Sequence, residues 1–228
     1  MRHLKNLVLT LAILLGLTIA LTSSRVLGET NSPSPSSTPV QADSFRLTGV
    51  AGADRSLSDF RGKTVVLEFV DFSCPTVQSE YKDKAVGSLQ EKLQSKGVVW
   101  LSVCSCKPGE AGFFSGKNLR LKLAQVGSRA SDDLIDSTAE VARKYRVNTV
   151  PTTLLIDPQG KIVYSGPAVF ARDSKDKSAS APVGALEAAF NKLSAGESST
   201  YSSLPTSGCA RNADGGSYSR AGQAVHHP

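Results

Sequence analysis

Two predominantly apolar runs, residues 64–72 and 98–104, place the strongest constraint on how this chain folds. Runs of this kind are typical of strands that are buried on both faces. Between them, residues 76–96 repeat apolar side chains along one stripe of a helix, and Gly97 ends the pattern. A strand, a helix and a strand at this spacing predict a parallel pair joined by a right-handed crossover, and therefore an α/β domain.

The rest of the chain extends the alternation of strands and helices. An insertion over residues 107–131 precedes a hairpin whose turn is Asp157-Pro158-Gln159-Gly160. Three further helices are expected, over residues 117–126, 139–145 and 182–195. The element order is strand, helix, strand, insertion, helix, hairpin, helix. This order predicts a central mixed β-sheet flanked by helices.

The N-terminus has the composition of a secretory signal. Two basic residues precede an uncharged run over residues 7–21, and residues acceptable to a signal peptidase lead up to Gly28. We expect residues 1–28 to be a cleaved signal, which predicts export to a periplasm or secretion. The alternative is an uncleaved anchor formed by residues 7–23, but Arg25 interrupts the run and about 20 apolar residues are needed to span a membrane.

Composition divides the remaining chain into three parts. Residues 29–42 are rich in Ser and Pro and read as a linker. Residues 43–196 are expected to form the folded domain, which at roughly 150 residues is enough for one core. Residues 197–228, dominated by Ser, Gly and Ala, are expected to be a flexible low-complexity tail.

The net charge of the chain does not indicate an anionic partner. The chain carries 26 Lys plus Arg against 20 Asp plus Glu, and three of the basic residues lie in the signal. The mature balance is therefore 23 against 20, an excess of +3 that is scattered along the sequence. We expect no nucleic-acid partner, and no membrane association once the signal has been cleaved.

Cys74 is the leading candidate for chemistry. It follows the first apolar run and stands directly before Pro75, at a corner between a strand and a helix. The positive end of the helix dipole stabilises a thiolate there, and proline costs little at the first helical position. Position 77 is Val77, so the second cysteine of a C-x-x-C pair is missing and a partner thiol must come from elsewhere.

Several motifs together carry a family resemblance. The domain resembles the thioredoxin-fold redoxins, close to the alkyl hydroperoxide reductase/thiol-specific antioxidant (AhpC/TSA) and thiol-disulfide oxidoreductase families. A narrower likeness, to exported redoxins with a Gly-Cys pair near the end of the tail, rests on residues 97–102 and on Gly208-Cys209. The motifs that support the broader resemblance are residues 58–63, 65–69, 74–75, 150–152 and 156–161.

The resemblance implies a fold and several residue roles. It implies a thioredoxin-like fold in which the Val150–Pro151 bond is cis and faces Cys74. The backbone around Val150, Pro151 and Thr152, together with Pro75, would then bind a substrate segment as an extra strand. Glu68 would be a buried acid that relays protons to the resolving cysteine. The alternative for Glu68 is a strand-end carboxylate that reaches water or a lysine, and we expect Asp71 to be a solvated loop residue.

Three cysteines compete to be the partner of Cys74. Cys104 and Cys106 end the adjacent strand, and because neighbouring strands lie about 4.8 Å apart, either one can approach Cys74 within disulfide range. We prefer Cys106 or Cys104 as the resolving thiol. Cys209 would then form a structural staple or act as a mobile resolving thiol. Four cysteines allow three complete pairings, and two purely structural disulfides remain an open alternative.

These residues predict an exported thiol-disulfide oxidoreductase. Its substrates would be protein or small-molecule disulfides and thiols, and no cofactor or metal is expected. The first alternative is a thiol peroxidase, although Leu67 and Asp71 stand where peroxiredoxins carry proline and threonine, and no arginine accompanies Pro151. The second alternative is a non-catalytic module, either disulfide-stapled or copper-binding. All three histidines lie outside the expected domain, which weakens the copper reading; they are His3, His226 and His227.

Overall fold

The structure is a computed structural model that describes residues 39–169, 184–197, 201–206, 208–211 and 218–220. The expected signal over residues 1–28 lies outside the described residues, as does most of the linker. In the ranges that are described, no helix is both long enough and apolar enough to cross a membrane.

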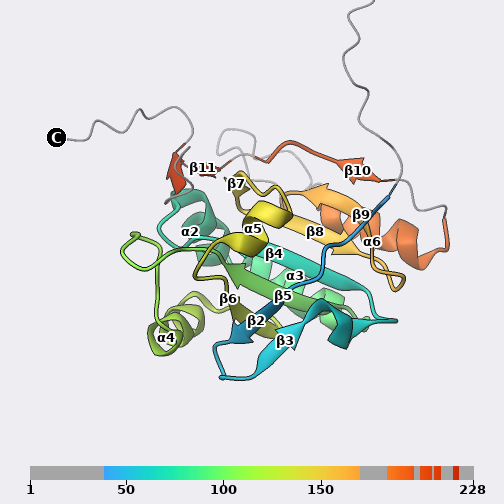
Figure 1. Cartoon of the computed structure of the whole chain (residues 1–228). Coiled ribbons are helices and arrows are strands. Elements are labelled where there is room, and N and C mark those ends of the chain that lie inside the picture. Colours follow the sequence, from blue (N-terminus) through green and yellow to red (C-terminus); the bar gives the residue numbers. More distant parts are fainter. Residues whose placement is uncertain (1–38, 170–183, 198–200, 207, 212–217, 221–228) are drawn as a thin grey trace, which may run out of the picture. The chain divides into compact units, whose positions relative to one another are not determined.

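A mixed β-sheet forms the centre of the domain (Figure 1). The strands follow the order β1-β9-β8-β4-β5-β6-β2-β3, and β10 pairs with β9 beside this path. Their bounds are β1 Val40–Gln41, β2 Arg46–Gly49, β3 Asp54–Ser56, β4 Val65–Val70, β5 Val99–Cys104, β6 Asp132–Ile135, β8 Thr152–Ile156, β9 Lys161–Gly166 and β10 Ser202–Ser203. A second, smaller sheet joins β7 Thr149–Val150, β11 Cys209–Arg211 and β12 Tyr218–Arg220.

The middle of the large sheet explains the apolar runs in the sequence. All six residues of β4 are buried, because helices cover both faces of the sheet. Strand β5 runs parallel to β4, with Val65 opposite Val99 and Val70 opposite Cys104, while β8 runs antiparallel on the other side. The predicted parallel pair with a helical crossover is therefore present.

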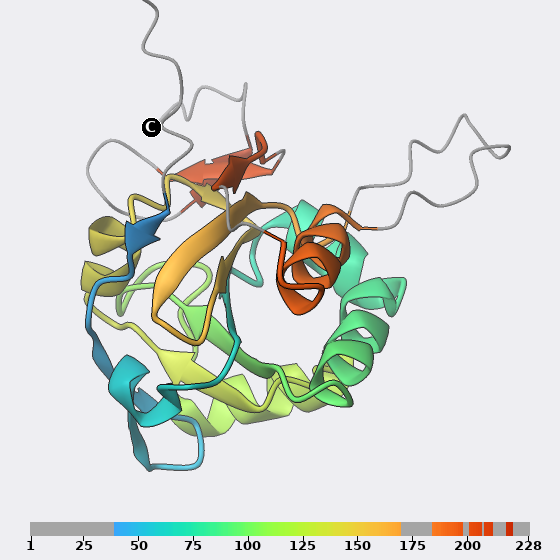
Figure 2. The ribbon, with the colours of Figure 1, turned by 90° about the vertical axis from the view of Figure 1, so that its right-hand side faces the viewer.

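Helices pack on both faces of this sheet. Figure 2 shows α3 and α6 on one side of the sheet and α5 on the opposite side. Among the largest fully buried side chains are Trp100 on β5 and Phe69 on β4, and the ring of Phe69 lies 5.9 Å from that of Tyr145. The helices are η1 Leu57–Phe60, α2 Pro75–Lys82, α3 Ala85–Gln94, α4 Gly116–Val126, α5 Glu140–Lys144 and α6 Ala185–Ser194. The arrangement confirms the predicted thioredoxin-like α/β fold.

The long helix expected over residues 76–96 is two helices. The backbone turns left-handed at Lys84, with φ of 57°, between α2 and α3. Apolar residues spaced four apart drift around a straight helix because its period is 3.6 residues. The break corrects this drift. Ala85, four residues after Tyr81 on the apolar stripe, is exposed, and the next residue, Val86, takes the buried position.

Part of the predicted tail pairs with the domain. Ser202 and Ser203 of β10 lie parallel to β9, and the N–H of Leu204 donates to the Ser165 carbonyl at 2.9 Å. Farther along, β11 pairs antiparallel with β7. Backbone hydrogen bonds join these strands to their neighbours. Every residue except proline can make such bonds, so the low content of large apolar residues in the tail did not predict the pairing.

Candidate functional site

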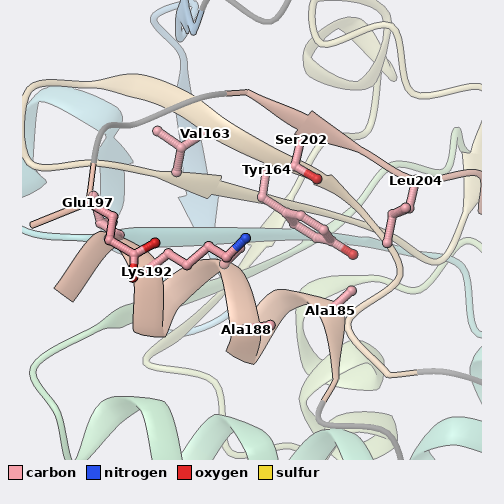
Figure 3. Close-up of a pocket in the computed structure, with 10 residues that line it drawn as sticks. Val163, Tyr164, Ala185, Ala188, Lys192, Glu197, Ser202 and Leu204 are labelled. Atoms are coloured by element: carbon pink, nitrogen blue, oxygen red, sulfur yellow. The ribbon is translucent and has the colours of Figure 1, made fainter. Parts of the chain in front are cut away.

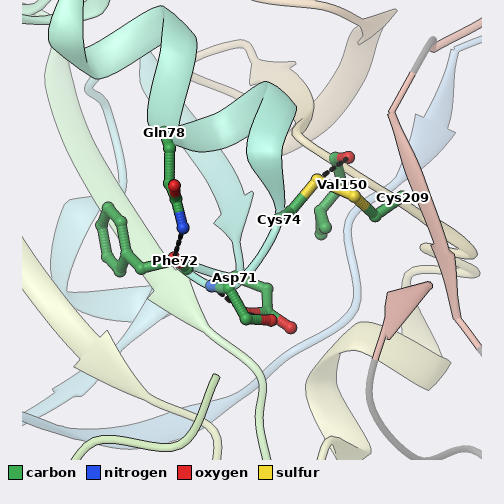
Figure 4. The surroundings of a disulfide bond; sticks show 7 residues. Asp71, Phe72, Cys74, Gln78, Val150 and Cys209 are labelled. Atoms are coloured by element: carbon green, nitrogen blue, oxygen red, sulfur yellow. Dashed lines mark hydrogen bonds between the residues drawn. A yellow bond between two sulfur atoms is a disulfide. The ribbon is translucent and has the colours of Figure 1, made fainter. Parts of the chain in front are cut away.

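Cys74 occupies the corner that the sequence predicted. It is the N-cap of α2, with extended backbone angles, and Pro75 fills the first helical position. Its N–H donates to the Asp71 carbonyl at 3.0 Å, and the Gln78 side chain donates to the Phe72 carbonyl at 2.7 Å (Figure 4). The loop between β4 and α2 is thus fixed by local hydrogen bonds, and the sulfur lies at the positive end of a helix.

Cys74 forms a disulfide with Cys209 (Figure 4). The Cα atoms are 5.9 Å apart, although the two residues are separated by 135 positions in the sequence. Both cysteines are 1% exposed. The partner of Cys74 therefore differs from the preferred Cys106 or Cys104. The pairing of β11 with β7 places Cys209 opposite Val150, beside Cys74.

The tail strand lies against the peptide bond that the resemblance singled out. The Val150–Pro151 bond is cis, and Cys209 is the register partner of Val150. The Sγ atom of Cys74 lies 3.7 Å from the Val150 carbonyl oxygen. The next residue, Thr152, is buried and donates its hydroxyl to the Thr149 carbonyl at 2.6 Å. The backbone edge expected to bind a substrate strand is occupied by the chain's own tail.

Gly208 allows this close approach. A Cβ atom at position 208 would lie 2.0 Å from the Val150 carbonyl oxygen and 3.2 Å from Cδ of Pro151. Any larger residue would push β11 away from β7. The sequence shows the Gly208-Cys209 pair, but it does not show that residue 208 must lack a side chain to fit against Val150.

Cys104 and Cys106 are free, buried thiols. Their sulfur atoms are 4.0 Å apart, and the Cys104 sulfur is 3.8 Å from the Gly112 carbonyl oxygen. The interaction with Cys104 raises the pKa of the Cys106 thiol, and burial raises it further. These two cysteines are close to each other and are not bonded to Cys74.

Glu68, on β4, is fully buried six residues before Cys74 in the sequence. Its Oε2 atom accepts hydrogen bonds from four side chains, and its Oε1 atom has no partner among the described residues. Burial raises the pKa of Glu68, and the four donors oppose that shift. The donors are Trp100 Nε1 at 2.8 Å, Tyr81 Oη at 2.9 Å, Ser102 Oγ at 3.0 Å and Gln90 Nε2 at 3.3 Å. The alternative of a strand-end glutamate that reaches water or a lysine is therefore wrong.

Asp71 is not the solvated loop residue that we expected. It is fully buried, and its Oδ1 atom accepts from the Ser73 N–H at 2.7 Å and from the Ser73 hydroxyl at 2.6 Å. Gly112, from the insertion, packs so closely that a Cβ atom there would lie 1.9 Å from Oδ1. The insertion covers Asp71, an effect that no local pattern around position 71 signals.

Arg211 is a residue of the site that the sequence reasoning missed. It stands two positions after Cys209, and its Nη2 atom donates to the Ser105 carbonyl at 3.0 Å. Ser105 also donates its hydroxyl to Asp136 at 2.8 Å. The strand that carries Cys209 is thus tied to the segment between Cys104 and Cys106.

Metal-binding clusters and cavities are the other features that bear on binding chemistry. Across the residues that the structure describes, no group of three or more His, Cys, Asp and Glu side chains is arranged to hold a metal ion, and His3, His226 and His227 lie outside those residues. A cavity of about 210 Å³ lies between α6, β9 and β10 (Figure 3). Its lining includes Tyr164, Ala188 and Lys192 but no cysteine and no residue of α2 or β7, so it is separate from the disulfide.

The structure defines a protein with a thioredoxin-like fold and a disulfide at the N-terminus of α2. The sequence profile of the AhpC/TSA family matches residues 40–165, which is more than half of the chain. The chain therefore belongs to the AhpC/TSA family.

Individual relatives agree with this assignment. The chain is 28% identical over 122 residues to the thiol-disulfide oxidoreductase ResA of Bacillus subtilis (strain 168); the match covers 54% of this chain and 63% of the relative, which is less than two thirds of its length. Among solved structures, an uncharacterized conserved protein from Geobacillus kaustophilus has a TM-score of 0.63 and 26% identity, covering 75% of this chain and 89% of that one. A hypothetical protein from Sinorhizobium meliloti 1021, with a TM-score of 0.65, 21% identity and coverage of 75% and 92%, shares the fold.

Proposed function

We propose that this protein is an exported thiol-disulfide oxidoreductase in which Cys74 is the nucleophile and a cysteine outside a C-x-x-C motif is the resolving thiol. The observation that carries the proposal is the Cys74–Cys209 disulfide at the N-terminus of α2, beside the cis Val150–Pro151 bond. The relatives named thiol-disulfide oxidoreductase ResA support it. Export rests on the composition of residues 1–28.

The proposed cycle is a disulfide exchange that conserves electrons. In the reduced protein, the Cys74 thiolate attacks a substrate disulfide, forms a mixed disulfide and releases one substrate thiolate. The Cys209 thiolate then attacks the Cys74 sulfur, which restores the Cys74–Cys209 disulfide and releases the second substrate thiolate. The substrate gains two electrons, and the two cysteines lose them. Cys106 or Cys104 is the alternative resolving thiol.

The surroundings of Cys74 support both steps. The helix N-terminus favours the thiolate as attacking group and as leaving group. Because burial raises the pKa of Glu68, this carboxyl holds a proton at a higher pH than an exposed glutamate does. We assign to Glu68 the delivery and removal of protons as the thiols change partners.

The edge of β7 suggests the form of the substrate. It pairs with β11 in an antiparallel register that places a cysteine opposite Val150. A substrate polypeptide bound as an extra strand at Val150, Pro151 and Thr152 would place its own cysteine at the same point. Protein disulfides are therefore the proposed substrate class, and small disulfides would react without this pairing. In this proposal residues 43–196 form the redox domain, and the tail over 197–228 supplies Cys209.

Trapping of the mixed disulfide tests the proposal. The full-length chain would be reduced, freed of reductant and mixed with insulin, whose disulfides serve as the probe. The Cys209→Ser variant should accumulate a Cys74–insulin mixed disulfide on non-reducing gels, because the resolving thiol is missing. The Cys74→Ser variant should form no such adduct, and Ser88→Ala, at an exposed position of α3, should behave as the wild type does.

Two results would contradict the proposal. The first is an adduct that forms equally well with Cys74→Ser. The second is consumption of hydrogen peroxide by the wild type faster than reduction of insulin, which would favour the thiol peroxidase instead. Trapping by Cys106→Ser or Cys104→Ser, but not by Cys209→Ser, would identify the alternative resolving thiol.

A further inference from the structure

Cys104 and Cys106 form a pair that the exchange at Cys74 and Cys209 leaves unused. Their sulfurs are 4.0 Å apart, both residues are buried, and both are free thiols. We propose that Cys104 and Cys106 are a second redox-active dithiol, which exchanges electrons with the Cys74–Cys209 disulfide inside the same chain. The inference rests on the proposed function, because it requires the Cys74–Cys209 disulfide to be reversible.

The local backbone allows these two sulfurs to bond. Cys104 ends β5, and Ser105 and Cys106 follow in irregular backbone. Side chains two positions apart in an extended chain face the same side. A disulfide requires the sulfurs to move from 4.0 Å to about 2.05 Å, which is within reach of side-chain rotation and a small loop movement.

Two sets of contacts bring this dithiol to the same end of the sheet as the active disulfide. In the first, Val70 and Cys104 are register partners at the ends of β4 and β5. The chain continues from Val70 through Asp71 to Cys74, and Asp71 packs against Gly112, whose carbonyl contacts the Cys104 sulfur. The loop that carries Cys74 therefore packs against the segment that surrounds Cys104.

The second set runs through the tail. Arg211 of β11 donates to the Ser105 carbonyl, so one strand carries Cys209 and also contacts the residue between the two thiols. Ser105 is held on its other side by Asp136, which also accepts the Ala142 N–H at 3.0 Å. A movement of β11 that frees Cys209 would act directly on the Cys104-Ser105-Cys106 segment.

Burial favours an internal partner over an external one. The four cysteines are between 1% and 5% exposed. A thiol or disulfide from solution reaches none of them without displacing part of the fold. A neighbouring thiol at the same end of the sheet needs only a local rearrangement, and its effective concentration is high because it belongs to the same chain.

The exchange balances without an added oxidant. The thiolate of Cys104 attacks a sulfur of the Cys74–Cys209 disulfide and gives an internal mixed disulfide. The other thiol of the pair then displaces it, leaving a Cys104–Cys106 disulfide and thiols at Cys74 and Cys209. Two electrons and two protons pass from one pair to the other. The Oδ2 atom of Asp71, which is buried and has no hydrogen-bond partner among the described residues, is a candidate acceptor for the proton in transit.

Differential alkylation of the full-length chain tests the proposal. Protein with an oxidised Cys74–Cys209 pair and reduced Cys104 and Cys106 would be incubated without oxygen or any added oxidant. It would then be quenched in acid and labelled with light and heavy N-ethylmaleimide before and after reduction. Trypsin gives one peptide, residues 97–117, that contains both Cys104 and Cys106. This peptide should appear with an internal disulfide in a fraction of the molecules, matched by an equal fraction of thiols at Cys74 and Cys209.

Variants separate this exchange from other oxidation. The Cys74→Ser variant lacks the internal oxidant, so its peptide 97–117 should stay fully reduced in the same incubation. On full oxidation with oxidised glutathione, the wild type should lose all four of its thiols as two internal disulfides. Cys104→Ser and Cys106→Ser should each lose only the Cys74 and Cys209 thiols to an internal disulfide. Arg211→Gln should slow the internal exchange, whereas Arg46→Gln, at an exposed position of β2, should not.

The results separate the two proposals. The inference is overturned if peptide 97–117 stays reduced at every ratio of reduced to oxidised glutathione that converts the Cys74–Cys209 pair, or if it oxidises equally well in Cys74→Ser. Neither outcome depends on insulin reduction. A chain that exchanges internally but forms no adduct with insulin would refute the proposed function alone. Circular dichroism of each variant identifies any that fails to fold. Cys104→Ser and Cys106→Ser each remove the second dithiol, so one of them can serve if the other does not fold.

Discussion

Several carboxyl groups are buried among the residues that the structure describes. Glu80 of α2 is 7% exposed, and its Oε2 atom has no hydrogen-bond partner among the described residues. Burial raises the pKa of Glu80 from its ordinary 4.5 to about 8, and the charge of Glu68 contributes to the shift. Burial likewise raises the pKa of Asp133 to about 7. These groups favour a protonated folded state near neutral pH.

The raised pKa of Glu80 predicts a stability that falls as pH rises. Between pH 4.5 and about 8 the folded protein binds a proton at Glu80 that the unfolded chain has lost, so the free energy of unfolding decreases across this window. Below the window both states are protonated, and above it both are ionised. Glu80→Gln should flatten this decline and stabilise the protein at pH 8, by an amount on the order of a few kcal/mol.

Urea unfolding at several pH values measures the effect. Glu197→Gln, at an exposed position after α6, is the matched control and should follow the wild-type curve. Some slope should remain in Glu80→Gln, because burial raises the pKa of Glu68 in the same direction. Identical pH profiles for Glu80→Gln and the wild type would contradict the assignment.

Among the elements, β11 decides whether Cys74 is covered. The sequence predicted a strand before Cys74 and a helix after it, because each has a local periodicity. Strand β11 has only three residues, Cys209 to Arg211, and no alternating pattern, so its pairing with β7 had no local signal. The same holds for the break at Lys84, which follows from how α2 and α3 pack on the sheet.

Gly208→Ala tests the role of β11. The new Cβ atom would lie 2.0 Å from the Val150 carbonyl oxygen, so β11 must move away from β7. We expect the Cys74–Cys209 disulfide to be reduced at a lower concentration of dithiothreitol, and Cys74 to be alkylated faster once it is reduced. Thiol labelling along a dithiothreitol titration measures both effects.

Gly116→Ala is the matched control for this change. A Cβ atom at position 116, the first residue of α4, would lie 3.7 Å from Ile135, an ordinary contact distance. This variant should titrate with dithiothreitol as the wild type does. If Gly208→Ala also does so, β11 does not control access to Cys74.

At the scale of the whole molecule, the disulfide closes the part of the domain from Cys74 onward into one loop. It joins residues 135 positions apart, and a cross-link over a long loop removes much conformational freedom from the unfolded chain. Loss of a native disulfide from a small domain typically costs about 2–5 kcal/mol. The same bond that we propose for the catalytic cycle therefore also stabilises the fold.

Cys209→Ser should lower the free energy of unfolding by about 2–5 kcal/mol relative to the oxidised wild type. Guanidinium chloride unfolding, followed by tryptophan fluorescence, measures the change; the chain has a single tryptophan, the fully buried Trp100. The wild type in dithiothreitol is the control, and it should match Cys209→Ser in the same buffer. Equal free energies of unfolding for the oxidised and reduced wild type would mean that the disulfide does not stabilise the fold.

The α/β order, the buried strands and the position of Cys74 before α2 could all be predicted from the sequence, because they depend on periodicity and on residues that are neighbours in the chain. The partner of Cys74 could not be predicted in this way. Cys209 is 135 positions away, and only the pairing of β11 with β7 brings it to the thiol. Likewise, Asp71 is buried because Gly112 of the insertion covers it. Contacts between distant segments have no local sequence signal, because they depend on how complete elements pack together.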